Sequence, residues 1–138
     1  MKEYERPIPV PDESTKGFWA AAREHRMAFQ RCKHCLTYAH PPVLFCKSCG
    51  ELEHPSFEFA AVAGRAQIVN WTVMHDSMVK GFDPPWVIVL LEFPEQRHLF
   101  YVSILEGEDT SRLKIGAAVE MTFRDINAEI SLPCCKLI

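Results

Sequence analysis

The chain of 138 residues is long enough for one compact domain, or for a small domain joined to a larger one. Its apolar content of 48% is ordinary for a globular protein, and its formal net charge is −3. The charge is uneven, because residues 1–50 carry eight Lys/Arg and five Asp/Glu, whereas residues 51–138 carry seven and thirteen. We expect any anionic ligand to meet the basic first part, although solvated faces without a partner would give the same imbalance.

No segment has the composition of a membrane span or an export signal. The longest apolar run, Trp86–Leu91, is far too short to cross a bilayer. Residues 1–7 lack the apolar stretch of a signal peptide. We therefore expect a cytoplasmic protein whose cysteines remain free thiols, available to bind a metal.

The first 26 residues predict an extended arm followed by a short helix. Prolines at three alternate positions within residues 7–11 favour a polyproline-like arm. Asp12–Ser14 offers helix N-cap chemistry, and the apolar face that begins with Phe18 and Trp19 predicts a helix ending near His25-Arg26. Such a helix is too short to be stable alone, so we expect both aromatic residues to be buried against the following segment or another subunit.

Two Cys-x-x-Cys pairs, Cys32/Cys35 and Cys46/Cys49, follow with ten residues between them. Each pair directs two sulfurs at one point, and two facing pairs form a tetrahedral four-thiolate cage typical of structural zinc. Gly50 follows the second pair, where such a turn often needs a positive φ. Leu36 holds the matching position after the first pair and is less suited to it.

Other uses of these cysteines remain open. A disulfide needs an oxidising compartment, and a thioredoxin-like dithiol needs one Cys-x-x-Cys, not two in tandem. Iron in a rubredoxin-like site uses the same four sulfurs, so the sequence favours zinc without excluding iron. His34 and His40 lie within the segment, and we interpret them as exposed loop residues rather than ligands.

The remaining sequence alternates in a β pattern. Met27–Arg31 and Tyr38–Phe45 are expected to form the strands of a metal ribbon over residues 27–54. From residue 55 to 138, the expected strands are 57–61, 66–74, 86–93, 98–105, 119–123 and 130–138. Five or six strands with a glycine-marked bend suit a small closed barrel of the OB-fold type.

The sequence resembles the bacterial and archaeal family that joins a rubredoxin-like zinc ribbon to an OB-fold. The resemblance covers nearly the whole chain and depends on the order of several short motifs: Phe18–Ala22, Gln30–Cys32, Cys35, Pro41-Pro42, Cys46 with Cys49-Gly50, Gly64-Arg65, Pro85–Val89 and Ile115–Glu120. The family usually has glycine where this chain has Leu36. The resemblance implies a mainly β fold and a zinc ion held by the four cysteines.

The resemblance also implies a function. Members of this family accompany thiolase-like enzymes, acyltransferases or retro-aldolases that act on acyl-CoA thioesters. The chain is thus expected to be an accessory subunit in a hetero-oligomer, with no catalytic residues of its own. Residues that could approach the phosphates of coenzyme A are those with basic side chains in the first part: Arg23, Arg26, Arg31, Lys33 and Lys47.

The sequence contains no pattern of a poised nucleophile, a zinc protease or a phosphate-binding loop. Cys134-Cys135 is the one pair of cysteines outside the ribbon, and we interpret it as packing. His75 and Asp76 could form an acid–base pair only in a loop, because neighbouring side chains of a strand point to opposite faces.

Residues 75–85 predict a long loop with little polar cover, and its apolar side chains Met78, Val79 and Phe82 are candidates for a partner surface. The alternative is that this loop folds back on its own barrel. Two other functions remain possible. A single-stranded nucleic-acid module would suit an OB-fold but not an acidic barrel region, and a rubredoxin-like electron carrier would require iron.

Overall fold

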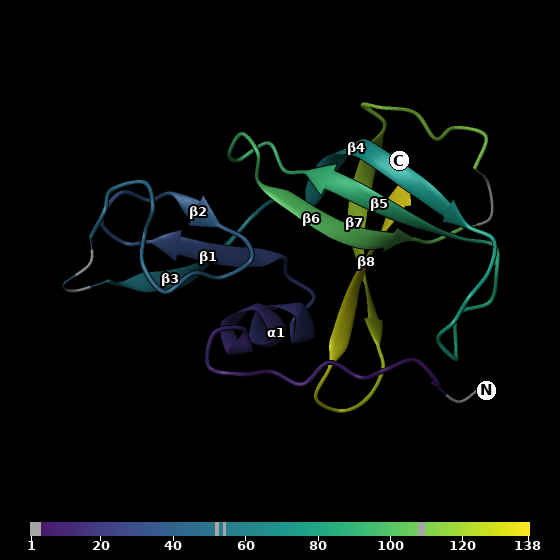
Figure 1. Cartoon of the computed structure of the whole chain (residues 1–138), viewed down its shortest axis with the longest axis horizontal. Coiled ribbons are helices and arrows are strands. Elements are labelled where there is room, and N and C mark those ends of the chain that lie inside the picture. The colour runs from purple at the N-terminus through teal and green to yellow at the C-terminus, as the bar shows by residue number, and fades with distance from the viewer. Residues whose placement is uncertain (1–3, 52, 54, 108–109) are drawn as a thin grey trace.

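The computed structural model describes residues 4–51, 53, 55–107 and 110–138. The described chain contains these elements: α1 (Lys16–Arg23), β1 (Ala28–Cys32), β2 (Tyr38–Ala39), β3 (Phe57–Ala61), β4 (Arg65–Met74), β5 (Trp86–Glu92), β6 (Phe100–Leu105), β7 (Ala118–Asp125) and β8 (Ser131–Leu137). A small sheet lies at one end and a barrel at the other, with α1 below the sheet (Figure 1).

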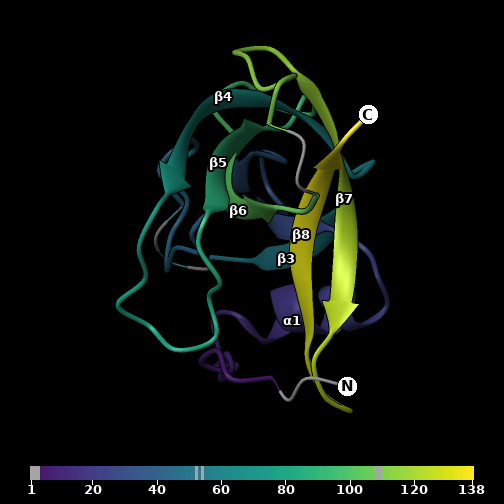
Figure 2. The same cartoon turned by 90° about the vertical axis from the view of Figure 1, so that its right-hand side faces the viewer.

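The predicted five-stranded barrel is confirmed. Its strands close in the order β4-β5-β6-β8-β7, and all pair antiparallel except β6 with β8. Side chains alternate along β5, where Val87, Val89 and Leu91 are buried and their neighbours are partly exposed. A register shift between Ile68 and Asn70 interrupts the pairing of β4 with β5, and β4 curves around the barrel (Figure 2). The mainly β class is therefore correct.

One strand lies elsewhere than the sequence indicated. β3, expected in the barrel part of the chain, instead pairs along its whole length with β1, from Ala28↔Ala61 to Cys32↔Phe57. The three-stranded sheet has the order β2-β1-β3. The physical reason is that β2 pairs with one edge of β1 and leaves the backbone groups of the opposite edge without partners, which β3 supplies.

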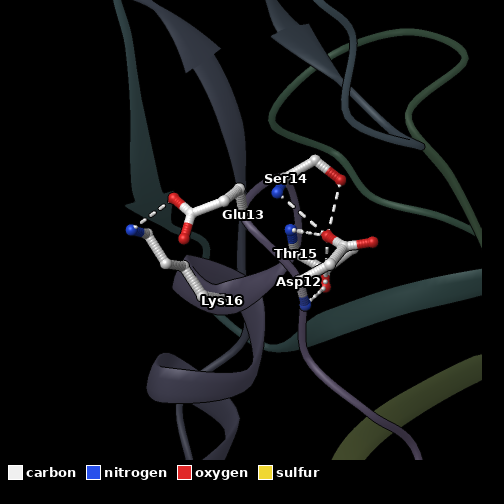
Figure 3. A network of polar contacts seen from close by, with 5 residues as sticks. All are labelled: Asp12, Glu13, Ser14, Thr15 and Lys16. Carbon is white, nitrogen blue, oxygen red and sulfur yellow. Dashed lines mark hydrogen bonds and ion pairs between the residues drawn. The ribbon is translucent and has the colours of Figure 1, made fainter.

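The helix is shorter than the sequence predicted, and its N-terminus is built differently. It ends at Arg23, and the N-cap residue Thr15 makes no side-chain cap hydrogen bond. Asp12 closes the preceding turn instead, because its Oδ1 accepts hydrogen bonds from the backbone N–H groups of Ser14 and Thr15, both at 2.9 Å (Figure 3). The hydrogen bond from the Ser14 side chain, followed by those from Thr15, holds the pKa of Asp12 below its usual value.

An aromatic cluster joins the small sheet to the barrel. We call Phe18, Phe29, His40, Phe93 and Tyr101 the junction cluster. The Phe29 ring packs edge-on against Phe93 at 5.1 Å between centroids, and His40 lies 5.4 Å from Tyr101. Phe29 and Phe93 are fully buried. The junction cluster thus makes the two parts share one core.

Polar contacts and the helix reinforce this junction. The backbone N–H of Tyr38 donates to the Oε1 of Gln96 at 2.8 Å, and the Nε2 of Gln96 donates back to the Tyr38 carbonyl at 3.0 Å. Phe18 is buried as expected, whereas Trp19 is half-buried. Gly17 allows the helix to approach β3 closely, because an added Cβ would lie 2.2 Å from the Phe59 ring.

Within the described residues, α1 is the one helix, and it is too short to cross a membrane.

We predict that Phe29→Ala lowers the free energy of unfolding by about 3–5 kcal/mol, because it removes a fully buried ring and leaves a cavity at the junction. Denaturant unfolding followed by circular dichroism measures the change. The control is Val102→Ala on β6, where the side chain is 61% exposed and the expected loss is within about 0.5 kcal/mol. A loss below about 1 kcal/mol for Phe29→Ala would show that the junction does not support the fold.

Candidate metal centre

The structure brings the four cysteines of the two Cys-x-x-Cys pairs to one point. The Sγ atoms of Cys32 and Cys49 lie 3.8 Å apart, and those of Cys35 and Cys46 lie 3.6 Å apart. All four Sγ atoms lie within 4.8 Å of one another. Cys32 and Cys46 are buried, whereas Cys35 and Cys49 are exposed. Cys32 is the last residue of β1, so the sheet positions one side of the centre.

The two turns that present the sulfurs have matching backbones. The Leu36 N–H donates to the Cys32 carbonyl at 2.8 Å, and the Gly50 N–H donates to the Cys46 carbonyl at 3.0 Å. Both residues have a positive φ, 63° for Leu36 and 73° for Gly50. The prediction that both positions need this conformation is confirmed, and Leu36 adopts it at the steric cost that glycine avoids.

The sulfur geometry fits a metal ion. Four thiolates at about 2.3 Å from a tetrahedral ion lie about 3.8 Å from one another. The Cys32–Cys49 and Cys35–Cys46 separations are close to that value. The cysteines are not in disulfides. Four thiolates complete a tetrahedral shell, so the centre would leave no open position for a substrate.

Neighbouring groups support the centre, and no pattern in the sequence indicated them. The hydrogen bond between Cys35 and the Thr37 hydroxyl, 3.2 Å apart, lowers the pKa of the Cys35 thiol to about 6, whereas burial and the neighbouring sulfurs raise the pKa of Cys49 to about 11. A bound metal ion would favour the thiolate form of all four cysteines. Gln30 fixes the chain between the two pairs, since its Oε1 accepts from the Val43 N–H at 2.7 Å and its Nε2 donates to the Val43 carbonyl at 3.0 Å.

The interpretation of His40 as an exposed loop residue is wrong. His40 belongs to the junction cluster, where its ring lies 5.1 Å from Phe29 and 5.9 Å from Phe18. Burial lowers the pKa of His40, so its ring is neutral and packs as an aromatic group. His34 is exposed, as expected. Neither histidine belongs to the four-residue metal cluster found in the described residues.

The five basic residues proposed to meet coenzyme A differ in their surroundings. Arg26 pairs with Glu24 at 2.6 Å, and Arg31 pairs with Glu58 at 2.9 Å on the neighbouring strand. The hydrogen bond to Glu58 raises the pKa of Arg31, and the Arg31 guanidinium is thus engaged by a carboxylate of the same sheet. The other three basic residues are exposed and form no ion pair with another residue that the structure describes: Arg23, Lys33 and Lys47. Their role toward coenzyme A stays a prediction.

The loop of residues 75–85 divides into an exposed part and a packed part. Met78 is fully exposed and Val79 is 46% exposed. Phe82 instead stacks on Trp86 at 4.4 Å between ring centroids, and the Arg6 guanidinium carbon lies over the Phe82 ring at 4.4 Å from its centroid. Of the three candidates for a partner surface, Met78 and Val79 are therefore available, while Phe82 packs against its own chain.

The remaining polar candidates have no catalytic arrangement. Burial raises the pKa of the Cys134 thiol to about 11 and that of Cys135 to about 12, so both are neutral packing groups, as expected. His75 and Asp76 are both exposed, and the Asp76 carboxylate accepts a hydrogen bond from the Ser77 N–H. No contact between His75 and Asp76 is found in the described part of the chain.

Comparison with known proteins defines the class as a two-part zinc-ribbon and OB-fold protein. The family model "ChsH2, rubredoxin-like zinc ribbon domain" matches residues 19–54, and the model "ChsH2, C-terminal OB-fold domain" matches residues 60–124. Together they cover most of the chain, which belongs to this ChsH2-type family, also called DUF35.

A curated relative and two solved structures extend the comparison. A probable enoyl-CoA hydratase alpha subunit from Thermomonospora curvata is 30% identical over 128 residues, covering 93% of this chain but only 39% of that protein. The chain thus spans well under half of this relative. A structure described as an Ltp2-ChsH2(DUF35) aldolase matches with a TM-score of 0.82 and 27% identity, over 94% of this chain and 98% of that chain.

A second structure shows the fold alone. This DUF35-family protein of unknown function from Sulfolobus solfataricus matches with a TM-score of 0.60 and 16% identity, over 91% of this chain and 86% of that chain.

We predict about one metal ion per chain in the purified protein, and loss of the ion in Cys46→Ser. Structural zinc contributes roughly 10–16 kcal/mol of apparent binding free energy in small peptides, so the variant should be metal-free or insoluble. Cys134→Ala, which removes a buried thiol of the barrel, should keep the ion. Elemental analysis by plasma mass spectrometry decides, and well-folded wild-type protein without metal would refute the centre.

A second prediction concerns the strained turn. Leu36→Gly should stabilise the metal-loaded protein by about 0.5–1 kcal/mol, because it relieves the left-handed conformation and Leu36 is 58% exposed. The reverse change, Gly50→Ala, should destabilise it by about 1 kcal/mol, since nothing lies near the added Cβ and only the backbone cost remains. Thermal melting compares them, and equal losses in both variants would contradict the explanation.

Proposed function

We propose that this chain is a non-catalytic accessory subunit that binds and stabilises a thiolase-like acyl-CoA enzyme. The observation that carries the proposal is the likeness, over 94% of this chain, to a chain in a structure described as an aldolase of Ltp2 and ChsH2(DUF35). The curated relative is likewise named as a subunit of an enzyme of CoA thioesters. The partner would supply the residues that make or break the carbon–carbon or acyl bond.

The chemistry of the described residues agrees with a helper role. A nucleophilic catalyst needs a base within hydrogen-bond reach of the nucleophile and a group that orients the base. Cys134 and Cys135 are buried with raised pKa values, so neither is a ready nucleophile. The described His25 and Asp125 form an exposed pair at 2.8 Å, but no hydroxyl or thiol nucleophile is recorded as bonded to His25.

We propose that the metal is zinc and that its role is structural. The four thiolates fit a closed tetrahedral shell, and the matching family model is described as a zinc ribbon. Iron would bind the same sulfurs, and the visible absorption of the purified protein separates the two metals, because zinc–thiolate sites are colourless. A strong visible band that disappears on reduction would favour the electron carrier instead.

The experiment that tests the accessory role starts from the native host. Tagged chain should co-purify with a thiolase-like subunit in a fixed ratio, the complex should act on an acyl-CoA substrate, and the chain alone should not. Size-exclusion chromatography with mass measurement gives the ratio. Turnover of an acyl-CoA by the chain alone, or a chain that remains without a partner under these conditions, would contradict the proposal.

The loop offers a variant for the same experiment. Met78→Asp should leave the melting temperature unchanged, because Met78 is fully exposed, and should weaken assembly by about tenfold or more if the exposed part of the loop lies at the centre of the interface. Phe82→Ala is the matched comparison, and it should lower the melting temperature, since the Phe82 ring contacts both Arg6 and Trp86. Unchanged assembly of Met78→Asp would exclude this loop as the interface.

A further inference from the structure

The outer face of β5 and β6 is apolar, although it points away from the barrel core. Val87, Val89 and Leu91 of β5 are buried inside the barrel, so the alternate residues of this strand point outward. In an antiparallel sheet with one face toward solvent, such outward positions are usually polar. In β5 and β6 they are filled by hydrocarbon side chains, which we call the outer sheet face: Ile88, Leu90, Val102 and Ile104.

Strand pairing places the four side chains of the outer sheet face next to one another. Ile88 pairs with Ile104, and Leu90 pairs with Val102. Residues directly opposite on two antiparallel strands have Cβ atoms about 4.5–5.5 Å apart, so the four side chains form one patch. Val102 is 61% exposed, and the other three are half-buried. β5 and β6 lie at the front of the barrel in Figure 1, with β7 and β8 behind them.

Within β4, β5 and β6, all of which the structure describes, no ionisable side chain lies in the outer sheet face or directly opposite it. The β4 residues opposite are Asn70 and Thr72. The one carboxylate of β5 is Glu92, which accepts a hydrogen bond from the His98 N–H at 2.7 Å. A phosphate or a nucleic acid would need cations that this face lacks, whereas a protein surface without charge at its centre would suit it.

The exposed loop of residues 75–85 extends from the same part of the sheet. It joins β4 to β5, and it begins and ends beside the paired residues Met74 and Trp86. It projects on the side of the barrel where β5 and β6 lie (Figure 2), and it carries the exposed side chains of Met78 and Val79. The loop and the outer sheet face thus lie where a single partner can contact both.

We propose that the outer sheet face is the apolar centre of the surface on which the thiolase-like subunit docks. This inference rests on the proposed accessory role and adds the place at which the partner binds. The occupant is an uncharged, apolar patch of that subunit, because the centres of stable protein interfaces are depleted in charged side chains. Docking removes a contiguous hydrocarbon patch from water, which the described chain leaves partly exposed. A second copy of this chain is the competing occupant.

The test places a charge in the outer sheet face of the full, metal-loaded chain and measures assembly with the co-purified thiolase-like subunit by isothermal titration calorimetry. Val102→Glu should weaken assembly at least about tenfold, because a carboxylate at the centre of an interface loses its hydration without gaining a partner. Ile115→Glu makes a matched change at a 74% exposed residue of the loop before β7, outside the outer sheet face, and should assemble like the wild type.

Stability is measured separately from assembly. Both glutamate variants change exposed residues, so their melting temperatures should match that of the wild type. Val102→Thr serves where Val102→Glu melts early, because threonine keeps the β-branched shape that strands favour. It should still weaken assembly at least about threefold, since the interface would bury its hydroxyl without a hydrogen-bond partner.

Three results would overturn the proposal. The first is assembly of a folded Val102 variant with wild-type affinity, and the second is an equal loss in Ile115→Glu. The third is a wild-type chain that forms a dimer alone and is dissociated by Val102→Glu, which would make a second copy the occupant. In the first two cases the wild type still assembles, so the accessory role stands and only the place of docking is wrong. A wild-type chain that assembles with no thiolase-like subunit would refute both.

Discussion

The meeting of four thiolates at one point is the constraint on which the first part of the structure depends. Between the end of β1 and the start of β3, the described chain contains only the two-residue strand β2, so few backbone hydrogen bonds hold it. The sulfurs of Cys32, Cys35, Cys46 and Cys49 lie at separations that a single ion can bridge. Metal ligation would take the place of the hydrophobic core that so short a segment cannot build.

The segment between β1 and β3 is also positioned relative to the barrel, because the junction cluster packs the small sheet against the barrel. Phe29 and Phe93 lie in contact across the boundary, and Gln96 of the barrel bonds the Tyr38 backbone in both directions. β3 belongs to the small sheet and leads within a few residues into β4 of the barrel. A metal ribbon fixed rigidly to a barrel is a suitable scaffold for positioning another protein, because little conformational entropy is lost on binding.

The sequence was most informative where the chemistry is local. The spacing of the cysteines predicted the metal centre, and the demand for a positive φ at Leu36 followed from the symmetry of the two turns. Alternation predicted the barrel strands but not their partners, so β3 was placed with the wrong neighbours; pairing depends on which edge of β1 is left open. The packing of Phe82 under Arg6 joins residues 76 positions apart, and no local pattern carries that information.

The most direct test of this account is hydrogen exchange of the backbone amides, compared between metal-loaded protein and protein stripped by a chelator. The account predicts that amides of the segment from β1 to Gly50 lose protection when the metal is removed, because ligation holds that segment. Amides in β4–β8 should keep most of theirs, since the barrel has its own buried core. Unchanged protection around the four cysteines after verified metal removal would contradict the claim that the thiolate centre organises the ribbon.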